Sequence, residues 1–137
     1  MSYTSQAELE ARLGVEELAQ LSDRVSGEVP DAEVIARAIA DAEAEIDGYL
    51  AARYALPLAV VPPILSRLAA ELARYFLRGT NANESERDRY GDVVRTLRAI
   101  GRGEMVLEGG DALGAGVGLN EADVLPSSRP LAFGRST

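Results

Sequence analysis

The chain has 137 residues and a mass of 14.6 kDa, which suits one domain of ordinary size. It contains no cysteine and no histidine, and all 14 of its cations are arginine, so disulfides, zinc–thiolate sites, thiol nucleophiles, histidine bases and lysine Schiff bases are excluded. The 22 acids give a net charge of −8, which disfavours a broad basic face for duplex DNA, because phosphate neutralisation supplies most of that affinity.

The chain carries no pattern of a membrane or secretion segment. Its longest apolar run, from Ala55 to Leu65, is interrupted by three prolines and is far shorter than the roughly 20 residues that a membrane span needs. The first residues also lack a basic region followed by an apolar one. We therefore expect a protein that is made in a cytoplasm and does not enter membranes.

The first predicted helix begins after Ser5. Ser5 and Glu8 form the pattern of a capping box, in which each side chain accepts a hydrogen bond from a backbone N–H of the first turn. Gly14 is a typical helix stop. The segment from Glu16 to Leu21 is long enough for one or two further turns, before Pro30 breaks the pattern.

The second predicted helix is the clearest, and it covers residues 32–53 after the N-cap Asp31. Its apolar residues follow the 3.6-residue period. They are Ile35, Ala38, Ile39, Ala42, Ile46, Tyr49 and Leu50. Gly48 is a poor helix former inside this predicted helix, and its presence predicts a close approach by a neighbouring helix or a local bend.

Two further helices complete the predicted fold. The third covers residues 63–78, with Pro63 at its first position, and its wide apolar face predicts the central, most buried helix. The fourth begins at Asn83, where Glu86 completes a second capping box. Four helices with short connections predict an all-α fold, a small antiparallel bundle over residues 1–103.

Residues 104–137 differ in composition and predict an extended tail that binds partners. This segment is rich in Gly, Pro and Ser, with apolar residues spaced between them. The run Met105-Val106-Leu107 could add a short strand to the exposed edge of a neighbouring protein. Leu131 and Phe133 are further candidate anchors for a partner. Pro126 and Pro130 oppose helix formation in this part of the tail.

Acidic side chains and glycines offer weak signals for chemistry. Asp41, Glu43, Glu45 and Asp47 lie inside a helical period, where a calcium loop would need non-helical backbone, so we interpret them as a solvated acidic face. The glycines at 114, 116 and 118 do not have the spacing or context of a dinucleotide fingerprint. A carboxylate pair acting as an acid–base dyad stays open as an alternative.

Four arginines lie near the apolar faces of the second and third predicted helices: Arg53, Arg67, Arg74 and Arg78. In a monomer their stems would cover apolar surface while their charged ends reach water. In an oligomer they could instead form bidentate pairs with acids of the next subunit. The sequence does not decide between these two interpretations.

One stretch of sequence resembles a known family. Residues 49–58 read YLAARYALPL, and they are followed by Val61-Pro62 and by AELARYFL at residues 70–77. Nothing in the packing of a helical bundle demands Arg-Tyr followed by Leu-Pro. Over about residues 3–103 the chain resembles the head–tail connection proteins of Mu-like phages and prophages.

The resemblance implies a structural adaptor of the virion neck with no enzymatic activity, metal or cofactor. Such proteins form a ring, usually of twelve copies, below the portal protein of a filled head. The ring extends the channel for DNA, which passes without specific binding, and presents a platform to the next neck or stopper protein or to the tail. We expect Asp41, Glu43, Glu45 and Asp47 to rim this channel, because like charge prevents phosphate pairing. The alternatives are a helical DNA-packaging or regulatory module and a carboxylate-based enzyme.

Overall fold

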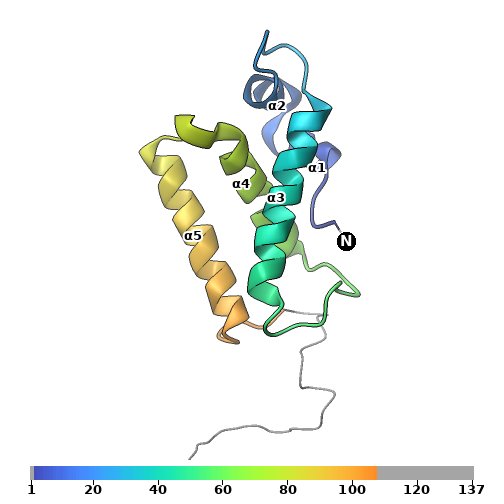
Figure 1. Cartoon of the computed structure of the whole chain (residues 1–137), viewed down its shortest axis with the longest axis vertical. Helices are drawn as coiled ribbons and strands as arrows, with labels where there is room; N and C mark the ends of the chain where they lie inside the picture. The colour runs from blue at the N-terminus through green and yellow to red at the C-terminus, as the bar shows by residue number, and fades with distance from the viewer. Residues whose placement is uncertain (1, 108–137) are drawn as a thin grey trace, which may run out of the picture.

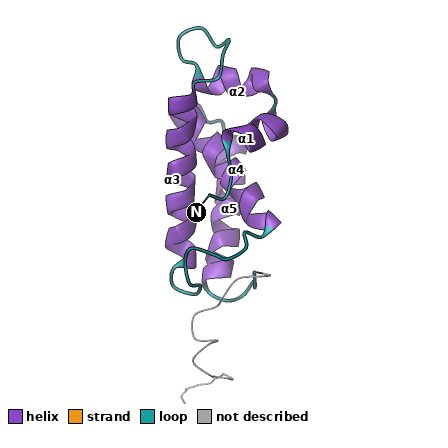
Figure 2. Ribbon diagram, turned by 90° about the vertical axis from the view of Figure 1, so that its right-hand side faces the viewer, coloured by secondary structure: helices purple, strands orange, loops and turns teal. Residues whose placement is uncertain are grey.

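The computed structural model describes residues 2–107. Three long helices, α3 (Ala32–Leu50), α4 (Pro63–Arg78) and α5 (Glu84–Gly101), form an antiparallel bundle in which α4 runs opposite to the other two (Figure 1). The short 3₁₀ helix η1 (Gly79–Asn81) joins α4 to α5. Two helices of eight residues, α1 (Gln6–Leu13) and α2 (Val15–Ser22), pack at the end of the bundle where α3 begins (Figure 2).

The all-α prediction is therefore confirmed, with one difference in the number of helices. The sequence predicted about four helices, whereas residues 2–107 form five α-helices, because the short segment after Gly14 is a complete two-turn helix. Gly14 ends α1 and starts α2, with φ at +92°. This left-handed conformation strains any residue with a Cβ, so the sharp turn between the two helices depends on glycine.

Capping residues fix where the long helices begin. The Asp31 carboxylate accepts hydrogen bonds from two backbone N–H groups at the start of α3, at 3.0 and 3.3 Å. At α5, both halves of the predicted capping box are present: the Glu86 N–H donates to the Asn83 side chain at 2.8 Å, and the Asn83 N–H donates to Glu86 at 2.9 Å. Pro63 occupies the first turn of α4, where its missing N–H is not needed.

The capping box predicted at α1 is only half formed. The Ser5 hydroxyl accepts from the Glu8 N–H at 3.2 Å, as the pattern predicts. The Glu8 carboxylate instead accepts from the Arg12 guanidinium one turn later, at 3.0 Å. The competing partner explains the difference, because the charged guanidinium at i+4 lies within reach of the same carboxylate.

The core is centred on α4, as its wide apolar face predicted. Leu65, Leu72 and Ala73 of this helix are completely buried, and Leu68 is 1% exposed. The facing residues of α3 and α5 are equally buried, including Ile35, Ile46, Leu50, Leu97 and Ile100. Each fully buried aliphatic side chain of this kind stabilises the fold by about 2 kcal/mol.

The close helix approach expected at Gly48 occurs at a different glycine. No atom lies within 4 Å of the position that a Cβ on Gly48 would take. A Cβ on Gly101, at the end of α5, would lie 2.7 Å from the Tyr49 carbonyl oxygen of α3. The prediction that Gly48 admits a neighbouring helix is therefore wrong within this chain, and the crossing of α3 and α5 depends on Gly101.

The chain beyond Gly103 returns to the core before the described residues end. Leu107 is 4% exposed and joins the main apolar cluster. Its N–H donates to the hydroxyl of buried Tyr54 at 3.0 Å. The packed helical unit thus includes Leu107, four residues past the boundary expected at residue 103. Residues 108–137, which hold most of the predicted tail, lie outside the described residues.

Candidate functional site

Glu43 and Asp47 of α3 hold the N-terminal segment against the helix. The backbone N–H of Tyr3 donates to Glu43 at 2.8 Å, and the Tyr3 hydroxyl donates to Asp47. Tyr3 is 3% exposed, and this burial is the largest cause of the raised pKa of its phenol. The hydrogen bond to Asp47 and the charges of Asp47 and Glu43 raise the pKa further. These two carboxylates therefore have a structural role, which anchors a segment 40 residues away in the sequence.

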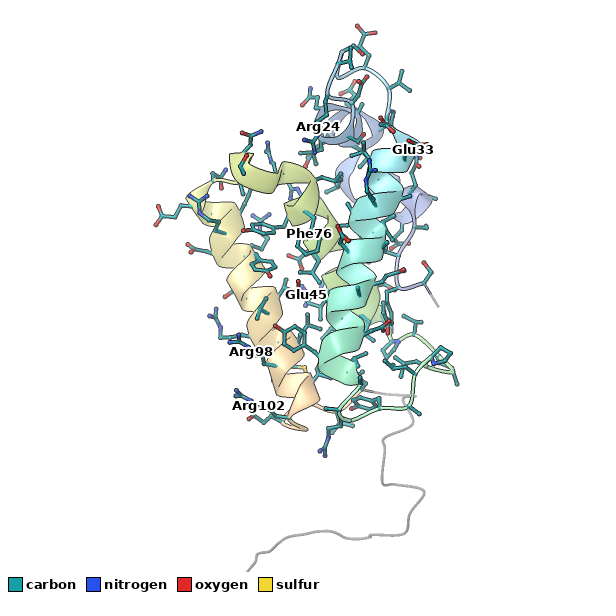
Figure 3. The ribbon with its side chains drawn as sticks, viewed as in Figure 1. Arg24, Glu33, Glu45, Phe76, Arg98 and Arg102 are labelled. Atoms are coloured by element: carbon teal, nitrogen blue, oxygen red, sulfur yellow. The ribbon has the colours of Figure 1, made fainter. Side chains whose placement is uncertain are left out.

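Glu45 lies on another side of α3, toward α5, as Figure 3 shows. Its two carboxylate oxygens lie 3.2 and 3.4 Å from the Tyr90 hydroxyl, which donates to them. The Tyr90 ring stacks on Tyr75 of α4, with centroids 4.3 Å apart and 10° between the planes. Burial raises the pKa of Tyr90 to about 12, with the Glu45 charge as the next contribution. The cluster ties all three long helices together.

Asp41 is the exposed member of the four acids. It lines a surface hollow between α3 and α4 together with Arg24, Arg37 and Phe76. The predicted solvated acidic face is thus wrong for Glu43, Glu45 and Asp47, which are half-buried and bonded to tyrosines. The acids lie on different sides of α3, and periodicity could not show that distant tyrosines would fold onto two of these sides.

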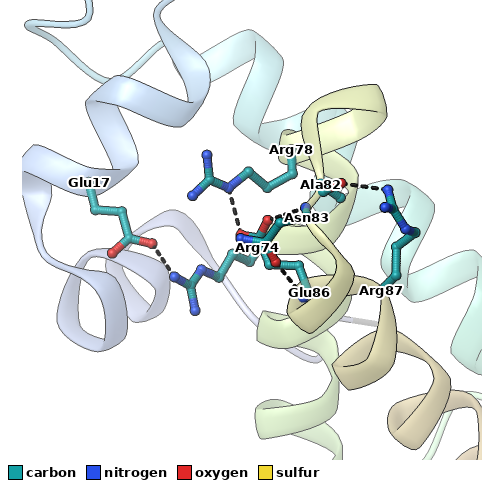
Figure 4. A network of polar contacts seen from close by, with 7 residues as sticks. All are labelled: Glu17, Arg74, Arg78, Ala82, Asn83, Glu86 and Arg87. Atoms are coloured by element: carbon teal, nitrogen blue, oxygen red, sulfur yellow. Dashed lines mark hydrogen bonds and ion pairs between the residues drawn. The ribbon is translucent and has the colours of Figure 1, made fainter.

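Three of the four singled-out arginines have carboxylate partners in their own chain. Arg74 pairs with Glu17 of α2 at 2.7 Å, and Arg78 pairs with Glu86 of α5 at 2.7 Å (Figure 4). Arg67 pairs with Glu71 one turn away, at 2.6 Å. The Arg74 and Arg78 pairs connect α4 to the helices on either side. Contact of these arginines with another subunit stays a prediction.

Glu86 has two functions at the junction of α4 and α5. One carboxylate oxygen accepts from the Asn83 N–H, and the other accepts from the Arg78 guanidinium. The hydrogen bond from the Asn83 N–H is the largest cause of the lowered pKa of the Glu86 carboxyl. The hydrogen bond and the charge of Arg78 lower it further. The sequence showed the cap but gave no signal for the Arg78 pair, which requires the fold.

Arg53 differs from the other three because no ion pair involves it among the described residues. Its guanidinium lies against Gly103, whose φ is +80°. The hydroxyl of neighbouring Tyr54 accepts a hydrogen bond from the Leu107 N–H. The carbonyl oxygen of Tyr49 packs closely against Gly101. The YLAARY run, residues 49–54, thus packs the end of α3 against the chain that follows α5.

The expected partner-binding run at 105–107 is divided between surface and core. Met105 is 40% exposed and Val106 is 76% exposed, whereas Leu107 is buried. The N–H groups of Met105 and Leu107 already donate to the Ala99 carbonyl and the Tyr54 hydroxyl. Two of the three backbone donors of this run are therefore already used, which opposes strand addition. Leu131 and Phe133 lie outside the described residues.

The described part of the chain holds no group of three or more carboxylates placed to bind a metal ion. Within the same residues, no helix is long and apolar enough to cross a membrane. The surface hollows are lined by arginines, acids and aromatic residues of α2 to α5.

The comparisons with known proteins give the family. A family model described as "Bacteriophage Mu, Gp36" matches residues 3–115. The chain belongs to this family. The match begins at the buried Tyr3 and covers every helix described above, so family membership refers to the whole helical unit.

Two relatives agree with the family model. Mu-like prophage FluMu protein gp36 of Haemophilus influenzae is 33% identical over 105 residues, which cover 77% of this chain and 74% of that protein. Gene product J of Escherichia phage Mu is 44% identical over 75 residues, which cover 55% of this chain and 53% of that protein. The resemblance to a family of Mu-like phages and prophages, inferred from the YLAARYALPL run, is confirmed.

Proposed function

We propose that this member of the Gp36 family is a structural protein of the virion neck. It forms a ring, usually of twelve copies, below the portal protein, extends the DNA channel and presents a surface to the next neck or stopper protein or to the tail. The observation that carries this proposal is the family match over residues 3–115. The bundle supports it, because an adaptor needs rigid helical faces and no reactive centre.

The roles of the acids also support a structural function over a carboxylate-based enzyme. An acid–base pair needs two carboxyl groups in one pocket with their pKa values pushed apart. Glu43 and Asp47 instead bond the same tyrosine in the N-terminal segment, and Glu45 bonds Tyr90 on the opposite side. Cysteine and histidine nucleophiles and bases are absent from the whole sequence.

The strong negative charge is compatible with a channel for DNA. Twelve copies at −8 would carry about −96 in total, screened beyond roughly 8 Å at physiological salt. Passing phosphates would be repelled, so DNA could move through without specific binding. That Asp41, Glu43, Glu45 and Asp47 face this channel stays a prediction; of these four, Asp41 has an exposed carboxylate in the described structure.

The test removes the gene from a phage or prophage that encodes this chain. We expect DNA-filled heads and free tails that do not join, and normal particles when the gene is supplied in trans. Electron microscopy of the rescued particles should then show a ring of this protein in the neck.

Complete infectious particles without the gene would overturn the proposal. A salt-dependent shift of duplex DNA in a gel by the purified protein would instead favour a DNA-packaging or regulatory module.

A further inference from the structure

Charge is divided unequally between the two halves of the helical unit. Residues 2–47, which contain α1, α2 and most of α3, hold 12 acids and three arginines, a net charge of −9. Residues 48–107, which contain α4 and α5, hold six acids and nine arginines, a net charge of +3. An acidic chain therefore has one distinctly basic part, and the fold decides where this part is exposed.

The basic part reaches the surface on the outward side of α5. Arg95, Arg98 and Arg102 are all exposed and recur at intervals of three and four residues, which aligns them along the helix. Arg95 pairs with Asp92, whereas Arg98 and Arg102 have no ion-pair partner in the described part of the chain. Figure 3 shows Arg98 and Arg102 on the edge of the molecule away from α3. We call these three residues the arginine face.

Small residues recur along the outward side of α3. Ala36, Ala40, Ala44 and Gly48 are exposed and spaced four residues apart. The added-Cβ position at Gly48 has no neighbour within 4 Å, so no part of the described chain covers this strip. We call these four residues the small face.

Carboxylates surround the small face. The exposed side chains of Glu33 and Asp41 lie beside it, and the half-buried side chain of Asp47 lies on its other flank. Arg37, the one cation of α3, is exposed beside Ala36, so three acids and one arginine border the face. A second helix could thus approach the small face closely and place cations beside these acids.

We propose that the arginine face of one copy docks on the small face of a second copy and pairs with the acids beside it. Charge complementarity identifies the occupant, because the arginine face carries two exposed guanidinium groups without an ion-pair partner in the described residues, in the basic half of the unit, and the small face lies in the acidic half and is flanked by acids. The guanidinium groups of Arg98 and Arg102 can form bidentate pairs with carboxylates across a close helix contact.

This contact joins two different surfaces of the molecule, so it is heterologous. Each copy keeps one free arginine face and one free small face, and association continues until a ring closes or a filament grows. The inference rests on the proposed ring and deepens it by naming the two surfaces. It also gives the exposed Gly48 of α3 a packing role that the described chain does not provide.

The test exchanges charge between the two faces. Variant one carries Arg98→Glu and Arg102→Glu, and variant two carries Glu33→Arg and Asp41→Arg. All four side chains are exposed, and none makes a side-chain hydrogen bond within the described structure, so both variants should fold. Self-association is measured by sedimentation velocity at low ionic strength, and the fold is checked by circular dichroism.

We expect each variant alone to associate about 30-fold more weakly than the wild-type chain, because like charges then face each other. An equimolar mixture should recover association, since each altered face then meets its opposite charge on the other variant. The control Arg89→Glu reverses the charge of an exposed arginine of α5 outside the arginine face, at a hollow between α4 and α5, and should associate like the wild-type chain.

Several results would overturn the inference. They are a wild-type chain that stays monomeric at low salt and high concentration, a mixture that fails to recover, or unchanged association of variant one. Loss of DNA binding in variant one without loss of association would assign the arginine face to nucleic acid. The results on self-association leave the proposed neck role untouched, because that role depends on the failure of heads and tails to join without the gene.

Discussion

Tyr90 shows how one side chain makes the stability of the fold depend on pH. Folding raises its pKa from 10 to about 12, so the stabilisation is fully present below pH 10 and is lost as the pH rises through 12. We expect the wild-type chain to lose about 1 kcal/mol from this group after allowance for solvent screening. Urea unfolding between pH 9 and pH 11.5 should show a smaller loss for Tyr90→Phe.

The charge of Glu45 contributes to this effect, which gives a control for it. Glu45→Gln keeps a hydrogen-bond acceptor near the Tyr90 hydroxyl but removes the negative charge. The phenol should then ionise at a lower pH than in the wild-type chain, as followed by tyrosine absorbance. An unchanged titration would show that Glu45 does not interact with the Tyr90 phenolate.

Two glycines of α5 should respond in opposite directions to alanine. A Cβ on Gly101 would lie 2.7 Å from the Tyr49 carbonyl oxygen, so Gly101→Ala should destabilise the fold by about 1–3 kcal/mol. No atom lies within 4 Å of the same position on Gly91, so Gly91→Ala should stabilise it by up to about 1 kcal/mol. Denaturant midpoints for the two variants would test the prediction, and equal shifts would contradict it.

At the scale of elements, the start of α5 is fixed by a cap that also reaches α4. The Asn83 side chain accepts from the Glu86 N–H, so Asn83→Ala should cost about 1 kcal/mol in thermal or denaturant unfolding. Asn83→Ser should recover most of this loss, because serine is also a good N-cap. Equal stability of the alanine and serine variants would contradict the capping role.

The same junction predicts a specific sensitivity to acid. Hydrogen bonds from Asn83 and Arg78 lower the pKa of Glu86, so its stabilisation is present above its ordinary pKa of 4.5 and is lost as the pH falls through the lowered value. Glu86→Gln should therefore be less stable than the wild-type chain at pH 7. The two chains should become similar in strong acid when their unfolding is compared across that range.

At the scale of the whole molecule, the end of the helical unit can be tested by truncation. Removing residues after Leu107 keeps the Tyr54 hydrogen bond and the buried Leu107 side chain, so the fold should keep its stability. Removing residues after Gly103 also deletes Leu107 and should cost roughly 2–3 kcal/mol. Equal unfolding midpoints for the two truncations would show that Leu107 does not stabilise the bundle.

The truncation after Leu107 also tests the role of the tail in assembly. If residues 108–137 bind neck partners, as the sequence predicts, this folded variant should fail to join heads to tails. Infectious particles from the truncated gene would show that the tail is dispensable.

The sequence by itself determined the helices, because helix starts and apolar periods are local properties of the chain. Asp31, Pro63 and the Asn83–Glu86 box predicted where the long helices begin, and the apolar period of residues 63–78 predicted the central helix. The YLAARYALPL run also predicted the family. These inferences needed only residues within a few turns of one another.

Only the tertiary structure decided what the polar residues contact, because partners distant in the sequence leave no periodic signal. Glu43 and Asp47 meet Tyr3, Glu45 meets Tyr90, and Arg78 meets Glu86. The close approach of α3 and α5 likewise depends on how the helices cross, which placed it at Gly101 and left Gly48 uncovered. Helix periodicity assigns a residue to a face, but the packing of the other helices determines whether that face meets solvent, a tyrosine or a backbone carbonyl.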